Sequence, residues 1–186
     1  MCKILSKFWL LAALCLGMAT AQAVVTTGNQ VWLQATTPTV AVGDTLSIDL
    51  VFDFSSDPTL GGVVDISYDS TLLSFSGYGA PATGWILTAP TTTAGSLTGL
   101  GLDALTASTG GSVLTLDFLA IGAGTASIGV ANSGAWNTFY DANNSPQSVT
   151  FTGTSVTVSA VPLPAALWLM LGGLGLLGWQ GRRLGS

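Results

Sequence analysis

The stretch from Thr45 to Phe54, "TLSIDLVFDF", decides the fold class of this chain. In an extended strand, successive side chains point to opposite faces. One face of this stretch would carry Leu46, Ile48, Leu50, Phe52 and Phe54. The other face would carry Thr45, Ser47, Asp49 and Asp53. Such alternation predicts a β-strand with one buried face and one hydrated face.

The same alternation returns along most of residues 24–160. It is found in "GGVVDISYD" (61–69) and "SVLTLDFLA" (112–120), and in the shorter runs "QVWLQA", "TASIGV", "SVTF" and "SVTVS". Clusters of turn-forming residues such as "SSDPTLGG", "GYGAPATG" and "DANNSPQ" separate these runs. The pattern predicts an all-β domain, an antiparallel β-sandwich of about eight or nine short strands.

Charge is distributed unevenly along the 186 residues. All four basic residues are terminal, and all nine acidic residues are Asp between Asp44 and Asp141. Removal of both ends would leave nine Asp and no basic residue, a net charge of −9. Such a surface repels nucleic acid. The central segment also lacks His, Cys, Lys and Glu, which excludes a Ser-His-Asp triad and predicts a protein that is not an enzyme.

The first 23 residues have the features of a secretory signal peptide. Lys3 and Lys7 precede an apolar run from Phe8 to Met18, and Ala21-Gln22-Ala23 forms an A-x-A cleavage site. We expect signal peptidase to cleave after Ala23 and the chain to be exported. The alternative is an uncleaved membrane anchor.

The last 26 residues, 161–186, read "VPLPAALWLMLGGLGLLGWQGRRLGS". Two prolines mark the start of an uncharged stretch that predicts a transmembrane helix over about residues 164–181. Arg182 and Arg183 would act as a membrane stop on the cytoplasmic side. A permanent C-terminal anchor and a removable sorting signal both fit this pattern.

This C-terminal layout resembles the VPLPA variant of the PEP-CTERM sorting signals. The matching residues are Val161, Pro162, Leu163, Pro164 and Ala165, followed by the apolar stretch and the two arginines. Leu163 stands where the main family has an acidic residue. The resemblance implies recognition by an exosortase, a membrane cysteine peptidase. It also implies a route from an inner-membrane precursor to the cell surface or extracellular matrix of a Gram-negative bacterium.

The domain between the two ends resembles a cohesin-like domain. The resemblance rests on "VGDTLSIDLVF" (42–52), "GGVVDISYDSTLLSF" (61–75), "GSVLTLDFLAIGAGTASIGV" (111–130) and "FYDANNSPQSVTFTGTSVTV" (139–158), taken in this order. It implies a nine-stranded jelly-roll sandwich. Some members of the family bind dockerin modules, a property that the resemblance does not extend to this chain.

Calcium is the one cofactor for which the sequence offers candidate ligands. Asp141, Asn143 and Asn144 in "DANNS" present hard oxygen atoms at loop spacing, and Asp53 with Asp57 forms a second candidate pair. The alternative is a turn that Asp and Asn form for backbone reasons alone.

Three aromatic residues are candidate carbohydrate contacts: Trp85, Trp136 and Tyr140. Tyr78 and Trp32 could also be exposed. The alternative for each is packing in the core or at the ends of the sandwich. Together these features predict a non-enzymatic surface or extracellular-matrix protein with a β-sandwich module for adhesion or interaction. Its partner would be a polysaccharide or another surface protein, and the alternative function is a carbohydrate-binding module.

Overall fold

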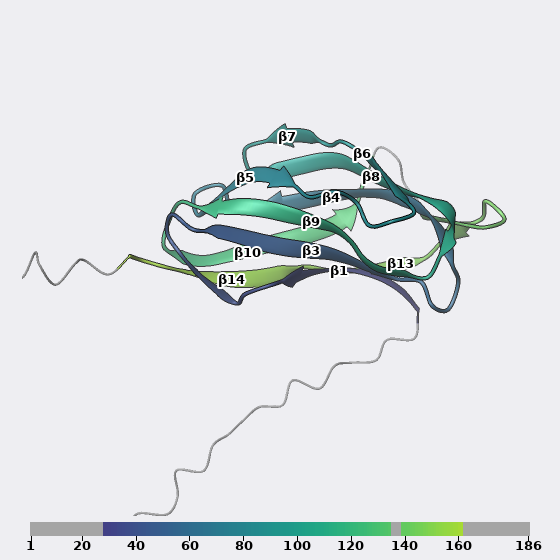
Figure 1. The fold of residues 1–186 in the computed structure, drawn as a ribbon, viewed down its shortest axis with the longest axis horizontal. Coiled ribbons are helices and arrows are strands. Elements are labelled where there is room, and N and C mark those ends of the chain that lie inside the picture. Colours follow the sequence, from purple (N-terminus) through teal and green to yellow (C-terminus); the bar gives the residue numbers. More distant parts are fainter. Residues whose placement is uncertain (1–27, 135–138, 162–186) are drawn as a thin grey trace, which may run out of the picture.

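A computed structural model describes residues 28–134 and 139–161 and shows two β-sheets packed face to face (Figure 1). The five strands of sheet A lie in the order β13 (Val149–Thr152), β1 (Asn29–Ala35), β3 (Thr45–Asp53), β9 (Gly110–Ala120) and β5 (Leu73–Tyr78).

Sheet B has nine strands. Its main path runs through β12 (Pro146–Gln147), β11 (Phe139–Asp141), β4 (Thr59–Tyr68), β10 (Gly124–Asn132), β14 (Thr154–Ser159) and β2 (Thr39–Ala41). Strand β8 (Ser96–Ser108) pairs with β4, and β6 (Trp85–Thr88) and β7 (Thr91–Thr93) pair with β8. The predicted all-β sandwich is therefore confirmed, with fourteen described strands where eight or nine were predicted.

The core lies between the two sheets and follows the predicted alternation. The five apolar residues of the stretch from Thr45 to Phe54 are each at most 2% exposed. Strands β4, β9, β10 and β14 add their own inward residues to the same core: Val64, Ile66, Leu114, Leu116, Phe118, Ala126, Ile128, Val130, Val156 and Val158. Burial of this continuous apolar surface is the main term that stabilises the sandwich.

At one end of the sandwich, four aromatic side chains pack together in the core. Phe52 meets Trp85 and Phe139 edge to face, with each pair of ring centroids 5.3 Å apart. Phe139 also stacks on Phe54 at 5.2 Å. Such aromatic pairs stabilise a core beyond the area that they bury.

The first and last strands run side by side in the same direction. Strand β1 pairs in parallel with β13 in sheet A, and β2 pairs in parallel with β14 in sheet B. Both segments thus cross from sheet A to sheet B together, the first near Pro38 and the last at Gly153. The other ladders are antiparallel, so the predicted antiparallel arrangement holds except where the terminal segments meet.

Strand β8 is the longest strand, yet the sequence pattern did not predict it. Its pairing with β4 shifts by one residue between Val64 and Ile66. At this bulge Gly99 has a φ of +77°, and its N–H donates to the Oδ1 atom of Asp65 at 2.8 Å. Because the extra residue changes which side chains point inward, β8 does not alternate strictly along its length.

The chain enters and leaves the sandwich at opposite ends (Figure 1). At the entry end, near the start of β1, Gln147 Nε2 donates to the carbonyl of Asp57 at 2.7 Å. At the exit end, the N–H of Val42 donates to the carbonyl of Ser159 at 3.0 Å. The domain thus presents an outer face on each sheet and two ends formed by loops. A site can lie on any of these surfaces.

Candidate functional site

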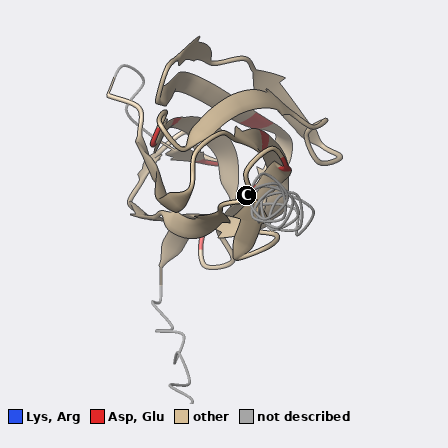
Figure 2. Cartoon of the chain, turned by 90° about the vertical axis from the view of Figure 1, so that its left-hand side faces the viewer, with Lys and Arg blue, Asp and Glu red and all other residues tan. Residues whose placement is uncertain are grey.

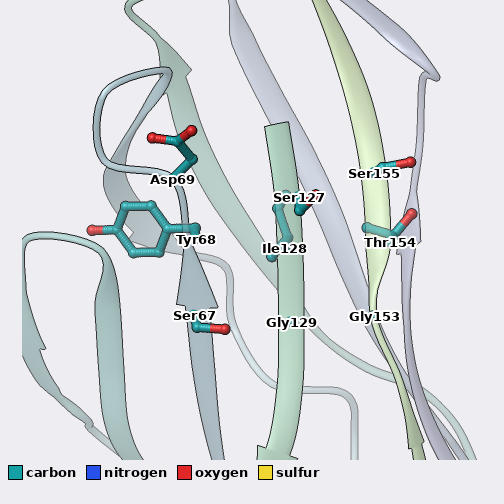
Figure 3. A pocket seen from close by; sticks show the side chains of 9 residues that line it. All are labelled: Ser67, Tyr68, Asp69, Ser127, Ile128, Gly129, Gly153, Thr154 and Ser155. Atoms are coloured by element: carbon teal, nitrogen blue, oxygen red, sulfur yellow. The ribbon is translucent and has the colours of Figure 1, made fainter. Parts of the chain in front are cut away.

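The outer face of sheet B carries a hollow of about 650 Å³ (Figure 3). It lies over β10, between the end of β4 and the start of β14. Ser127 pairs across the sheet with Ser155, and Gly129 pairs with Ser67. The residues of these two cross-strand pairs are all serine or glycine. The surface is hollowed at this place because no large side chain projects from it.

Asp69 lies at the rim of this hollow (Figure 3). Its Oδ1 atom accepts hydrogen bonds from the hydroxyl of Thr71 at 2.6 Å and from the N–H of Thr71 at 2.9 Å. These two bonds, the hydroxyl first, lower the pKa of Asp69, so the carboxylate is ionised at neutral pH. The hollow thus combines hydroxyl groups with one negative charge.

Tyr68 lines the hollow, but its side chain is fixed by contacts with other residues of the domain. Its ring meets Phe118 edge to face with centroids 5.1 Å apart, and its hydroxyl donates to the carbonyl of Thr93 at 3.3 Å. The ring is therefore part of the packing between the sheets rather than a platform on the surface.

Three exposed apolar side chains share the same face of sheet B. Ile86 on β6 is 51% exposed, Leu105 on β8 is 69% exposed, and Tyr140 on β11 is 40% exposed. Ile86 pairs with Asp103 on β8, Asp103 pairs with Gly61 on β4, and Gly61 pairs with Tyr140. Leu105 lies two residues beyond Asp103, on the same side of its strand.

The outer face of sheet B therefore has two parts. A polar hollow lies near the exit end, and apolar side chains lie beyond it along β6, β8 and β11. A surface with exposed apolar groups beside polar ones is typical of protein interfaces.

The described residues carry only negative charges. In Figure 2 the ribbon is red at Asp positions, and no part of the described chain has the blue of Lys or Arg. Within residues 28–134 and 139–161 no group of three or more His, Cys, Asp or Glu residues could hold a metal ion. The arrangement can bind a partner, but these residues include no His or Lys that could act as a base beside a hydroxyl nucleophile.

Of the three predicted carbohydrate contacts, the structure describes Trp85 and Tyr140 and does not bring them together on one surface. Trp85 is only 9% exposed and packs into the core against Phe52, so its ring faces are not available to a ligand. Tyr140 is exposed on sheet B, and Trp136 lies outside the described residues. Tyr78 is 38% exposed on β5, in the other sheet. No shared aromatic platform is formed by the described members of this set.

The predicted calcium ligands form a tight turn between β11 and β12. Asp141 Oδ1 accepts the N–H of Ser145 at 2.7 Å and the N–H of Asn143 at 2.9 Å. Asn144 has a left-handed φ of 60°. The bond from Ser145 is the main cause of a lowered pKa for Asp141, with smaller contributions from Asn143. One carboxylate oxygen of Asp141 is thus already used to hold the turn.

The second predicted pair lies at the entry end, with Asp53 as the last residue of β3 and Asp57 in the loop that follows. Asp53 accepts the N–H of Ser55 at 3.0 Å, and hydrogen bonds from Ser55 lower the pKa of Asp53. Calcium binding at either place stays a prediction.

Most residues of the predicted sorting segments lie outside the described part of the chain. This applies to Ala21 and Ala23, to Pro162, Leu163, Pro164 and Ala165, and to Arg182 and Arg183. Val161, the last described residue, is 60% exposed. No helix that could span a membrane is found among the described residues.

Of the residues that make the candidate site, the sequence singled out Tyr140 and missed the serines of the hollow and Leu105. Ser67, Ser127 and Ser155 are outward positions of separate strands, and only the strand register brings them together. Leu105 lies in β8, which was not predicted. Each serine occupies an outward position of a predicted strand, and this position is the signal by which the sequence could have identified it.

Several solved structures are similar to this fold. A cohesin module of a family 33 glycoside hydrolase from Clostridium perfringens matches 73% of this chain and 100% of its own length, with a TM-score of 0.61 and 8% identity. A non-cellulosomal cohesin from Archaeoglobus fulgidus matches 72% of this chain and 92% of its own, with a TM-score of 0.55 and 10% identity. The described domain has the fold of a cohesin module.

A third similar structure is a type II cohesin–X–dockerin complex from Acetivibrio cellulolyticus. Its matching chain has a TM-score of 0.55 and 13% identity and covers 70% of this chain and 99% of its own. The cohesin fold agrees with the resemblance seen in the sequence. No protein-family model matches the chain, and no curated protein matches its sequence. The identities to the cohesin structures are low, so the likeness establishes the fold alone.

Proposed function

We propose that this cohesin-like domain is a non-catalytic interaction module that binds a partner protein through the outer face of sheet B. The observation that carries the proposal is the grouping on one face of Ile86, Leu105 and Tyr140 with the serine-lined hollow. Apolar groups exposed together with polar groups beside them match the layout of a protein interface, an apolar centre with a polar rim. The dockerin-bound cohesin among the similar structures adds support from the same fold.

The partner's contact surface should be neutral or basic. Asp103 lies between the apolar residues and Asp69 lies at the hollow, and the described residues hold no positive charge to offset them. An acidic partner would be repelled, whereas Lys or Arg side chains would find partners.

Site-specific photo-crosslinking tests this function. A benzophenone amino acid is introduced at Leu105 on sheet B or, as the control, at Ser112 on the outer face of sheet A, in the full chain in its own cells. We expect one defined protein adduct from position 105, and its loss when Ile86→Asp is added. Equal adducts from both positions, or none from position 105, would contradict the proposal.

We further propose that the chain is exported and sorted by an exosortase-type system. Signal peptidase would act after Ala23, and the tail from Val161 would hold an inner-membrane precursor until its removal delivers the domain to the cell surface or extracellular matrix. The order of motif, apolar stretch and arginines in residues 161–186 supports this route. The exposure of Val161 beyond the last strand leaves the junction accessible to a peptidase.

Intact-mass spectrometry of the protein recovered from cells and from medium tests the route. A mature mass that begins at Val24 and ends near Val161 is expected in the extracellular fraction. A chain that keeps Arg182 in that fraction would show that the tail is not removed.

A further inference from the structure

The outer face of sheet A carries a surface tryptophan. Trp32 lies on β1 between Val31, which is fully buried, and Leu33, which is 3% exposed, so its side chain points away from the core. It is partly exposed and is not among the residues packed against the core. Its cross-strand neighbours are Val51 on β3 and Thr152 on β13.

Val51 has the same character as Trp32. It is partly exposed, it lies on the outer face of β3, and it is not packed against the core. Directly opposite residues in a sheet have Cβ atoms about 5 Å apart, so the indole ring and the valine side chain form one apolar platform. No other aromatic ring of the described residues contacts the Trp32 ring.

Polar groups lie beside this platform, on the next rows of β1, β3 and β9. Gln34, two residues along β1 from Trp32, is exposed and pairs with Asp49 on β3. Asp49 Oδ1 accepts the hydroxyl of Thr115 at 2.7 Å. On the next row, Asp117 Oδ1 accepts the hydroxyl of Ser47, also at 2.7 Å.

These two hydrogen bonds orient the carboxylates. The described residues place no hydrogen bond on the Oδ2 atom of either Asp49 or Asp117. Each Oδ2 atom can therefore accept a hydrogen bond from a ligand hydroxyl.

We propose that the outer face of sheet A binds a neutral polysaccharide chain, with Trp32 stacked on one sugar ring. The indole ring offers a flat apolar face to the C–H groups of a pyranose ring. Gln34 can donate and accept, and the carboxylates of Asp49 and Asp117 can accept from sugar hydroxyls.

Charge selects the kind of polysaccharide. The described residues provide acceptors and negative charge but no cation, so an anionic polymer would be repelled. Adjacent strands are about 4.8 Å apart, and the groups extend over β1, β3 and β9. The face is therefore wider than one ring and suits a chain of sugars. This inference does not depend on the partner-protein function of sheet B.

Affinity electrophoresis provides the test. The full chain, purified in a detergent without a sugar headgroup, is run in native gels that contain dextran, mixed-linkage β-glucan or mannan, with alginate as the anionic control. We expect at least one neutral polymer to retard the protein and alginate not to. Trp32→Ala should weaken that binding roughly tenfold or more, because truncated tryptophan contacts are often dominant at interfaces.

Matched variants separate binding from folding. Trp32→Phe keeps an apolar ring and should restore part of the affinity, and Asp117→Asn should weaken it. Tyr140→Ala, on the other sheet, should leave it unchanged, and thermal melts of every variant report whether the fold is kept. The proposal is overturned if no neutral polymer retards the wild-type chain, or if a folded Trp32→Ala variant is retarded equally.

Discussion

The ring of Phe139 lies directly against the backbone of Gly62, so that a Cβ atom at position 62 would come within 2.6 Å of the ring. Phe139 is 1% exposed and stacks on Phe54, which leaves it no room to move away. This contact joins β11 to β4 beneath the row that carries Tyr140.

Gly62→Ala should therefore destabilise the domain by about 1–3 kcal/mol, the usual effect of overpacking a core. Urea denaturation of the full chain measures the change. Gly79→Ala is the matched control, because a Cβ there would meet its nearest atom at 3.8 Å, an ordinary contact. Equal stability of the two variants would show that the Phe139 contact is not tight.

The bulge in β8 should depend on the left-handed backbone of Gly99. Gly99→Ala places a Cβ at a φ of +77° and should reduce the free energy of unfolding by about 1 kcal/mol. Gly99→Asn should reduce the free energy of unfolding by less, because Asn tolerates the left-handed backbone region better than Ala. The opposite ranking in denaturant melts would show that the strain at this position is unimportant.

The turn held by Asp141 should stabilise the domain only while its carboxylate is ionised. Hydrogen bonds from Ser145 and Asn143 lower the folded pKa of Asp141 from its ordinary value. A lowered folded pKa gives stability that is present above the unfolded pKa and is lost as the pH falls through the folded pKa. Asp141→Asn should therefore melt below wild type at pH 7, with a difference that closes below about pH 4. A difference that is constant with pH would contradict this.

Salt should stabilise the domain at neutral pH. Residues 28–134 and 139–161 contain nine Asp and no Lys or Arg, so their charges only repel one another. Raising the ionic strength from about 0.01 M to about 0.15 M shortens the screening length from about 30 Å to about 8 Å. We expect the melting temperature to rise by a few degrees in NaCl. Asp103→Asn should raise it in low salt and reduce the response, whereas a melting temperature that falls with NaCl would contradict the prediction.

Calcium binding at the turn between β11 and β12 can be tested by calorimetry of the full chain with millimolar calcium and with chelator. A ligand that binds the folded state raises the melting temperature. The predicted site requires a higher melting temperature in calcium than in chelator, whereas melts that coincide would show that Asp141 only holds the turn through the N–H groups of Asn143 and Ser145. A higher melting temperature in calcium that is lost in Asp141→Asn would establish a site.

The candidate surfaces could be predicted only in part. The outward phase of Ser67 and Trp32 follows from the alternation of their strands, and both are at least partly exposed. The sequence did not show whether Trp85 points into the core, because β6 has four residues, too few for a pattern to show which face is buried. The sequence pattern also could not show that Ser127 and Ser155 lie side by side. Their strands are separate in the sequence and meet only through the register of the sheet.

By itself, the sequence determined the all-β class, the buried residues of the regular strands and the absence of positive charge between residues 24 and 160, because alternation and composition are local properties. Only the tertiary structure decided that β8 joins β4, that the terminal strands run in parallel, that Trp85 is buried and that Trp32 lies beside Val51. These outcomes depend on bulges and on pairings between distant segments. Their free energy comes from contacts that form only when both sheets close on one core.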